Sequence, residues 1–278
     1  MTSLQLKNPK FWLSGIAIGC ITIYLTLVWI ADNSSLFSVS CLFWAAVSSL
    51  IWDRRNDLHL ESGMFSSLFA FSLLILLLVK AASLTSFGMF LLVLPPLLGF
   101  CVALLASGFK RLAQYKKELL ILIVFSITNV IPRIPFDISQ FTAKFAAFIL
   151  WYMGTEVIRN GENIHLKTGS VEVYGGCSGI ELIGQMLGIA CLFLLMFTLD
   201  IKKRILVPIV ATLVAFIVNG FRVALMANLV ASNQREAFKY WHEGDGSLIF
   251  SLIAVLCLGV FCWFMLGSGT SNRSNAKT

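Results

Sequence analysis

The chain has 278 residues, of which 58% are hydrophobic and 13% are charged, and its mean hydropathy is +0.86. These values exclude an ordinary soluble globular domain and indicate a protein that lies in a lipid bilayer. The net charge of +7 is distributed in short clusters between apolar runs, which is typical of topology signals and gives no indication of a nucleic-acid site.

Eight apolar runs reach or approach the roughly 20 residues that a helix needs to cross a bilayer core. They are residues 11–31, 36–52, 64–83, 87–107, 118–133, 178–199, 205–230 and 247–267. The first run is too long for the core of a signal peptide and is followed by no convincing small-residue cleavage site. We therefore expect it to remain as a helix.

Basic residues cluster before the first run and after every second run. Because basic residues mark the cytoplasmic side, this alternation predicts eight crossings with both termini in the cytoplasm. The clusters are Lys7 and Lys10; Arg54 and Arg55; Lys110, Arg111, Lys116 and Lys117; Lys202, Lys203 and Arg204; and Arg273 and Lys277. The predicted fold is an all-α multi-pass membrane protein, with residues 1–278 forming a single integral membrane domain.

Two segments are predicted to lie outside the membrane. In the longer one, 134–176, the spacing of apolar residues in 136–151 predicts an interfacial helix. Alternating residues in 157–173, interrupted by Asn-Gly and Thr-Gly turn signals, predict a small extracytoplasmic β-meander. The second segment, 231–246, is polar and contains His242, Glu243 and Asp245.

The chain contains seven cysteines, an odd number that predicts no disulfide framework. Six lie inside apolar runs, where cysteine usually acts as a small buried hydrophobe: Cys20, Cys41, Cys101, Cys191, Cys257 and Cys262. No CxxC pair or His/Cys cluster has the spacing of metal ligands, so neither a metal site nor a cofactor is predicted. Cys177 stands apart from these six.

Cys177 lies within Gly175-Gly176-Cys177-Ser178-Gly179, where the meander ends and the sixth apolar run begins. Glycines permit unusual dihedral angles, and a helix start supplies free amide donors and the positive end of a dipole. Both features favour a thiolate, the nucleophilic form of cysteine. The alternative is that this sequence is only a tight connection between a strand and a helix.

Polar residues in the next two runs fall at the predicted depth of Cys177. Glu181 and Gln185 follow it by four and eight residues, and an acid inside a membrane helix normally faces the bundle interior, where it can also form an ionic lock. Arg222 lies 17 residues after Ile205, about 26 Å along a helix, with Asn219 on the same face. Arg222 is predicted to stabilise an oxyanion or the thiolate, or to grip an anionic group. The alternative is outward snorkelling.

His242 precedes the last run on the same predicted side, and histidine is the usual general base near neutral pH. Two other histidines compete with it: His165 falls in an alternating strand, where solvent exposure explains it, and His59 falls on the cytoplasmic side. Together, Cys177, Arg222 and His242 supply the nucleophile, polariser and base that cysteine acyl transfer requires.

These residues also carry a resemblance to a known family. Gly-Cys-Ser-Gly at a helix start, Asn-x-x-Arg late in a following helix and His-x-x-x-Gly before the last helix resemble the exosortase/archaeosortase family, and most closely its cyanoexosortase branch. Two positions depart from the family pattern: Gly175-Gly176 replaces an acidic residue or alanine before the cysteine, and Val218 replaces the arginine before Asn219.

The resemblance implies a membrane cysteine protease or transpeptidase in the bacterial plasma membrane. Cys177 would be the nucleophile and Arg222 and His242 its partners, with Ser178, Glu181 and Asn219 in support. Its substrates would be exported precursors with a C-terminal Pro-Glu-Pro-type signal, a transmembrane helix and a basic tail. The enzyme would form an acyl-thioester and pass the protein to an acceptor in the envelope.

Three other interpretations of the sequence stay open. A boundary protease would end the reaction in hydrolysis instead of transfer. A transporter would use Glu181, Gln185, Asn219 and Arg222 to line a substrate path, although no inverted repeat supports it. A scaffold would bind a partner through its outer meander.

Overall fold

The computed structural model describes residues 9–83, 88–133, 137–242, 244 and 246–274. Its contacts divide the chain into two compact units, Met1–Val130 and Ile131–Thr278, which are described separately. That the chain acts as a single domain stays a prediction.

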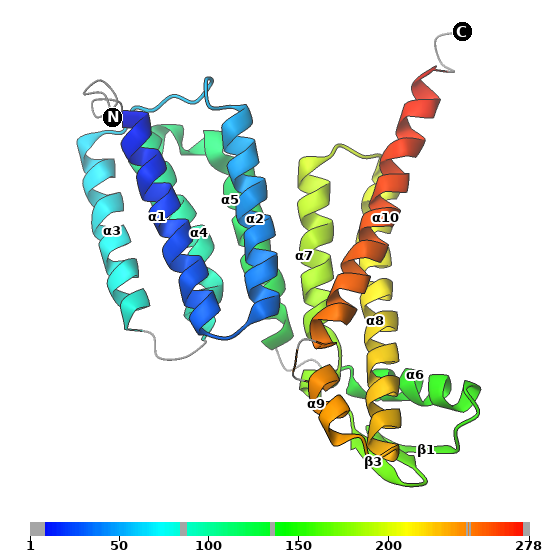
Figure 1. The fold of residues 1–278 in the computed structure, drawn as a ribbon. Helices are drawn as coiled ribbons and strands as arrows, with labels where there is room; N and C mark the ends of the chain where they lie inside the picture. The colour runs from blue at the N-terminus through cyan, green and yellow to red at the C-terminus, as the bar shows by residue number, and fades with distance from the viewer. Residues whose placement is uncertain (1–8, 84–87, 134–136, 243, 245, 275–278) are drawn as a thin grey trace. The chain divides into compact units, whose positions relative to one another are not determined.

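The first unit is a bundle of helices arranged around α4 (Figure 1). Its elements are α1 (Pro9–Ile30), α2 (Ser34–Asp53), α3 (Met64–Ala82), α4 (Met89–Ser107), the 3-10 helix η1 (Phe109–Tyr115) and α5 (Lys116–Val130). Asn33 caps α2 by accepting a hydrogen bond from the Leu36 amide at 2.9 Å. Gly108, with a φ of +65°, ends α4 in the left-handed region that favours glycine.

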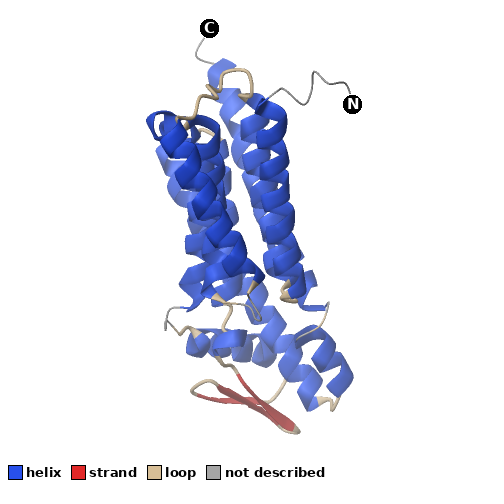
Figure 2. Ribbon diagram, turned by 90° about the vertical axis from the view of Figure 1, so that its left-hand side faces the viewer, coloured by secondary structure: helices blue, strands red, loops and turns tan. Residues whose placement is uncertain are grey.

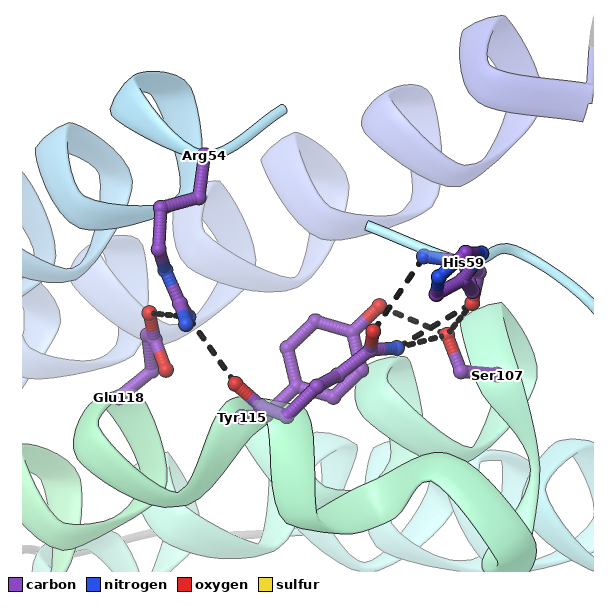
Figure 3. A network of polar contacts seen from close by, with 6 residues as sticks. Arg54, His59, Ser107, Tyr115 and Glu118 are labelled. Atoms are coloured by element: carbon purple, nitrogen blue, oxygen red, sulfur yellow. Dashed lines mark hydrogen bonds and ion pairs between the residues drawn. The ribbon is translucent and has the colours of Figure 1, made fainter. Parts of the chain in front are cut away.

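A buried carboxylate helps to close one end of this first bundle. Glu118, at the start of α5, is 3% exposed and pairs with Arg54 just after α2, at 2.5 Å between Nη2 and Oε1 (Figure 3). The same guanidinium nitrogen donates to the Gln114 carbonyl at 3.0 Å. The pair therefore ties the end of α2 to the start of α5.

Hydroxyl and amide groups extend this network to the chain segment before α3 (Figure 3). Ser107 donates to the His59 carbonyl at 2.6 Å and lies 2.9 Å from the Tyr115 hydroxyl. The Gln114 side chain donates to the same carbonyl at 3.2 Å and accepts from the His59 amide at 3.3 Å. The backbone of His59 thus contributes to the structure of the first unit.

The second unit contains the remaining elements of the chain (Figure 1). These are η2 (Ile131–Arg133), α6 (Ser139–Tyr152), β1 (Val157–Asn160), β2 (Asn163–Leu166), β3 (Gly169–Glu172), η3 (Gly175–Cys177), α7 (Ile180–Met196), α8 (Ile201–Ala231), α9 (Arg235–His242) and α10 (Gly246–Ser274). Helices α7, α8 and α10 contact one another, while α6, the sheet and α9 surround the C-terminal part of α8.

The three strands form the predicted meander, in the order β1-β2-β3 with antiparallel pairing throughout. Figure 2 shows them in red beyond the ends of the long helices. Ile164 and Val173 are fully buried against Ala227 and neighbouring residues of α8 and α6. Thr168 donates to the Ala231 carbonyl at 2.5 Å, so the β2–β3 turn is attached to the last residue of α8.

In the described residues, six helices are long and apolar enough to cross a membrane, rather than the expected eight. The six are Lys10–Ile30, Ser34–Asp53, Met64–Ala82, Met89–Ser107, Ile201–Ala231 and Gly246–Leu266. Helices lie on the other two runs as well, but α5 has 15 residues and α7 has 17. At 1.5 Å per residue these span about 23 and 26 Å, less than the roughly 30 Å core of a bilayer.

The fold class itself is confirmed: the chain is a multi-pass helical membrane protein with a small antiparallel sheet. The predicted interfacial helix corresponds to α6, which begins at Ser139; residues 134–136 lie outside the described residues. That α6 lies at the membrane interface, and that the sheet is extracytoplasmic, stay predictions.

Candidate active site

The turn that carries Cys177 is built by the small residues around it. The Cys177 amide donates to the Tyr174 carbonyl at 2.8 Å, and the Ser178 hydroxyl donates to the Gly175 carbonyl at 2.7 Å. Gly179 has a φ of +90°, and a Cβ there would lie 2.6 Å from the side-chain nitrogen of Asn219. The glycine is required both by its dihedral angle and by this close approach.

Two buried side chains hold the backbone of this turn in place. Asn219 of α8 donates from Nδ2 to the Cys177 carbonyl at 2.9 Å, and Thr142 of α6 donates to the Ser178 carbonyl at 2.6 Å. Asn219 is 2% exposed and Thr142 is fully buried. Thr142 was not predicted from the sequence. It forms a polar pair with Ser139, three residues earlier on the buried face of α6, and this spacing is the feature of the sequence that could have indicated it.

The thiol of Cys177 faces the imidazole of His242 across 65 residues of sequence. The Sγ–Nε2 distance is 3.1 Å, and the Tyr174 hydroxyl lies 3.4 Å from the same nitrogen. Phe238 stacks on the imidazole, with ring centroids 5.1 Å apart and planes 12° from parallel. The stacking on Phe238 therefore holds the imidazole with its Nε2 atom within hydrogen-bond distance of the sulfur.

His242 is the last residue of α9, a helix that was not predicted from the sequence. The segment was interpreted only as polar, although its apolar residues Phe238 and Trp241 are spaced by three and Glu236 lies in the first turn. These are features of a short amphipathic helix. Glu243 and Asp245 lie outside the described residues.

Arg222 of α8 contacts the backbone of α9. Its Nη2 donates to the His242 carbonyl at 2.7 Å, and its charge acts on the Cys177 thiol. Its Nε is buried and has no hydrogen-bond partner among the described residues. The guanidinium thus fixes the end of α9 and contributes positive charge beside the sulfur.

Burial raises the pKa of the Cys177 thiol above its usual 9.0, and a hydrogen bond from Tyr174 and the charge of Arg222 only partly oppose this. Burial therefore opposes the thiolate that the helix start was expected to favour. Cys177 is 6% exposed and lies three residues before the start of α7, and its burial has the largest effect on its pKa. The raised pKa favours the protonated thiol, which lies beside the imidazole of His242.

A raised pKa predicts slow alkylation of Cys177 at neutral pH. Because the thiolate fraction rises tenfold per pH unit below the pKa, the iodoacetamide rate should increase about tenfold per unit from pH 7 to 9. Tyr174→Phe removes a group that lowers the pKa and should shift the curve to higher pH. Mass spectrometry of the Cys177 peptide measures the rate. A fast rate that is flat between pH 6 and 8 would instead indicate a preformed thiolate.

Glu181 and His165 are both exposed. Glu181 is exposed, contrary to the expected position inside the bundle, because it lies at the margin of the buried stripe formed by Leu182, Gln185 and Met186. Its charge still acts on Arg222. His165 is exposed on β2, as expected.

An open cavity of about 210 Å³ leads to the thiol. Its wall comes from β3, the turn that carries Cys177, the last turns of α8 and one face of α9. The lining residues are Ser170, Val171, Glu172, Tyr174, Cys177, Met226, Val230, Phe238 and His242. Cys177 and His242 therefore lie together on the wall of a cavity that a small molecule or a chain segment can enter.

The sequence model of transmembrane exosortases matches residues 29–259, a range that contains every residue of this site. The chain belongs to the transmembrane exosortase family. The probable archaeosortase E of Methanocaldococcus jannaschii is 29% identical over 168 residues, which are 58% of this chain and 87% of the relative. No solved structure matches the chain.

Membership of this family confirms the resemblance drawn from the sequence motifs and shows that the chain is a membrane protein-sorting enzyme in the general sense. Placement in the cyanoexosortase branch stays a prediction. The catalytic roles of the individual residues are proposals, which rest on the geometry described above.

Proposed function

We propose that this exosortase-family protein is a cysteine-dependent peptidase or transpeptidase that cleaves exported proteins at a C-terminal Pro-Glu-Pro-type sorting signal. The observation that supports this best is the 3.1 Å contact between Cys177 Sγ and His242 Nε2 at the wall of an open cavity. A nucleophile within hydrogen-bond reach of a base is the arrangement that covalent acyl transfer requires.

In the proposed reaction, Sγ attacks the scissile carbonyl carbon while its proton moves to His242 Nε2. The tetrahedral intermediate collapses when the C–N bond breaks and His242 returns the proton to the leaving amine. This step leaves an acyl-thioester on Cys177 and releases the C-terminal membrane segment. Attack by water or by an acceptor nucleophile in the envelope then releases the sorted protein and restores the thiol. The reaction requires no cofactor.

Arg222 is proposed to stabilise the oxyanion of that intermediate, since its positive charge acts at the sulfur and does not depend on pH in the working range. Asn219 fixes the Cys177 backbone, and Ser178 fixes the turn. Glu181 balances part of the charge of Arg222. These three are positioning residues in this proposal.

The proposed location is the bacterial plasma membrane, with both termini in the cytoplasm and the thiol at the extracytoplasmic face. In this topology the shorter helices α5 and α7 also pass between the two sides. Helix α8 begins with Lys202, Lys203 and Arg204 and reaches the site at its other end. The Lys203 amine donates to the Met265 carbonyl at 2.7 Å, so the basic start of α8 lies beside the C-terminal half of α10. The positive-inside rule assigns that end to the cytoplasm.

The partners in this proposal are membrane-anchored precursors, an acceptor in the envelope and the lipid bilayer, with no nucleic acid. The test is co-expression of an epitope-tagged precursor carrying the Pro-Glu-Pro signal, transmembrane helix and basic tail. The wild-type enzyme should convert it to a shorter form. A precursor whose signal is scrambled should stay intact. No conversion of the intact signal, or equal conversion of both, would refute the proposed substrate class.

A further inference from the structure

The cavity at Cys177 meets the free edge of the sheet. In the order β1-β2-β3, only one side of β3 is paired. Successive side chains of a strand point to opposite faces, yet Ser170, Val171 and Glu172 all line the same cavity. The element that these three residues share is the backbone edge of β3, so the cavity lies along that edge.

The register of the sheet identifies which backbone groups point into the cavity. Leu166 pairs with Gly169 across a two-residue turn, and the Val173 amide donates to the Glu162 carbonyl at 3.0 Å. Antiparallel ladders alternate between hydrogen-bonded and non-hydrogen-bonded pairs. The amide and carbonyl groups of Gly169, Val171 and Val173 therefore point toward β2.

The amide and carbonyl groups of Ser170 and Glu172 consequently point away from β2, toward the free edge. Within the described part of the chain, no hydrogen bond to the backbone of either residue is found outside the sheet ladder. Two donors and two acceptors thus line a cavity that also contains the thiol. An unpaired strand edge of this kind is a template for an additional strand.

We propose that the precursor segment just before the scissile bond binds in extended form as a fourth strand along β3, which delivers the next carbonyl to Cys177. The occupant is the substrate polypeptide, and this assignment rests on the proposed function. Five residues after Glu172, the same chain reaches the nucleophile, so one continuous segment would both position and cleave the substrate.

The direction of this added strand follows from the position of β3 beside α8. A Cβ on Gly169 would lie 3.0 Å from a Val230 methyl group, whereas the Cys177 carbonyl bonds to Asn219. Val230 and Asn219 are 11 positions apart, about 16 Å along α8. From Gly169 onward the chain therefore runs from the C-terminal end of α8 back along this helix, toward the bilayer in the proposed topology. A precursor that ends in a membrane helix runs the same way. The pairing is therefore parallel.

Parallel pairing explains why a Pro-x-Pro signal suits this edge. In a parallel ladder, the substrate residue between Ser170 and Glu172 donates to the first and accepts from the second, while its two neighbours direct their backbone groups away. Proline has no amide to donate and is tolerated where that amide would face outward. The middle residue of Pro-Glu-Pro keeps both groups.

Proline substitutions test the edge directly. Ser170→Pro and Glu172→Pro each remove one edge amide without removing a bond to β2. In the parallel ladder the Glu172 amide donates to the middle residue of the signal, and the Ser170 amide donates to the residue two positions before it. Each substitution should therefore lower precursor processing by about three- to tenfold. The matched control is Arg159→Pro: the register of β1 and β2 points the Arg159 amide to the opposite free edge. It should process like wild type. All variants are compared at equal protein level and equal Cys177 alkylation rate. Wild-type processing by both edge variants would refute the docking while leaving the proposed function intact.

Disulfide trapping tests docking independently of cleavage. Precursors with single cysteines before the scissile bond are combined with Ser170→Cys or Glu172→Cys, each in a Cys177→Ala background. The cross-linked position should lie about two residues nearer the scissile bond for Glu172→Cys, whereas the Arg159→Cys control should not cross-link. The reverse order would refute parallel pairing, and no cross-link at any position would refute docking on β3. If the precursor forms these cross-links but the wild-type enzyme does not process it, only the proposed function would be refuted.

Discussion

Cys177→Ala is expected to abolish precursor processing, with a loss of at least about 10³-fold, because no other group in the site can form the acyl-thioester. Cys177→Ser should be nearly as inactive, since the neutral hydroxyl is a much weaker nucleophile than sulfur. The matched control is Cys257→Ala, which removes an exposed cysteine of α10. An immunoblot time course at equal enzyme levels measures the loss.

The comparison with Cys257→Ala separates chemistry from folding. Cys177 packs in a core cluster with Ala143 and Val223, so truncation to alanine removes one sulfur from that cluster. Cys177→Ala should therefore keep wild-type protein levels. Processing at the wild-type rate by Cys177→Ala would contradict the nucleophile assignment, whatever the behaviour of the control.

His242→Ala is expected to lower processing by about 10²- to 10⁴-fold, the usual contribution of a general base. The neutral thiol makes this base essential, because burial raises the Cys177 pKa and leaves little thiolate at neutral pH. The loss should fall on the rate of acylation rather than on substrate affinity. His165→Ala, on the exposed face of β2, is the control and should process like wild type.

Added imidazole offers a second readout for His242→Ala. The substitution leaves a space beside Phe238 and Tyr174, which contact the native ring, and free imidazole can enter it and accept the thiol proton. Partial recovery of processing with millimolar imidazole should occur for His242→Ala and not for Cys177→Ala. Unchanged processing by His242→Ala without imidazole would exclude the proposed base.

Hydropathy and turn chemistry predicted most of the fold. Each apolar run contains a helix, and the Asn-Gly and Thr-Gly signals lie at the two turns of the sheet. The number of membrane-length helices was predicted wrongly because hydropathy extended the fifth run into η2 and the sixth run past Met196, where Phe197 is extended. Helix ends depend on local backbone conformation, which an apolar composition does not report.

The site was predicted less completely than the fold. The predicted membrane depth and side placed Cys177, Arg222 and His242 at one level. In the structure Cys177 and His242 line one cavity, and Arg222 donates to the His242 backbone carbonyl. The contributions of Thr142 and Tyr174 depend on tertiary contacts between elements distant in sequence. The direction of the shift in the thiol's pKa was not predicted, because burial has the largest effect on it and a glycine-rich motif does not reveal burial.

The geometry also bears on the transporter interpretation. Asn219 and Arg222 donate to the backbone carbonyls of Cys177 and His242, and Glu181 is exposed instead of facing into the helices. Two of the four side chains that would line a transport path, Asn219 and Arg222, thus support the turn and the helix that carry the thiol and the imidazole. Family membership assigns the chain to protein sorting.

The most direct test of the central claim is detection of the acyl-enzyme. Wild-type enzyme processing a tagged precursor is quenched in acid, digested and analysed by mass spectrometry for the peptide that contains Cys177. We expect that peptide to carry the new C-terminus of the precursor, to lose it in neutral hydroxylamine, and to be unmodified when His242→Ala replaces the wild type. Processing without any adduct on Cys177, at the same rate in Cys177→Ala, would contradict a thiol mechanism.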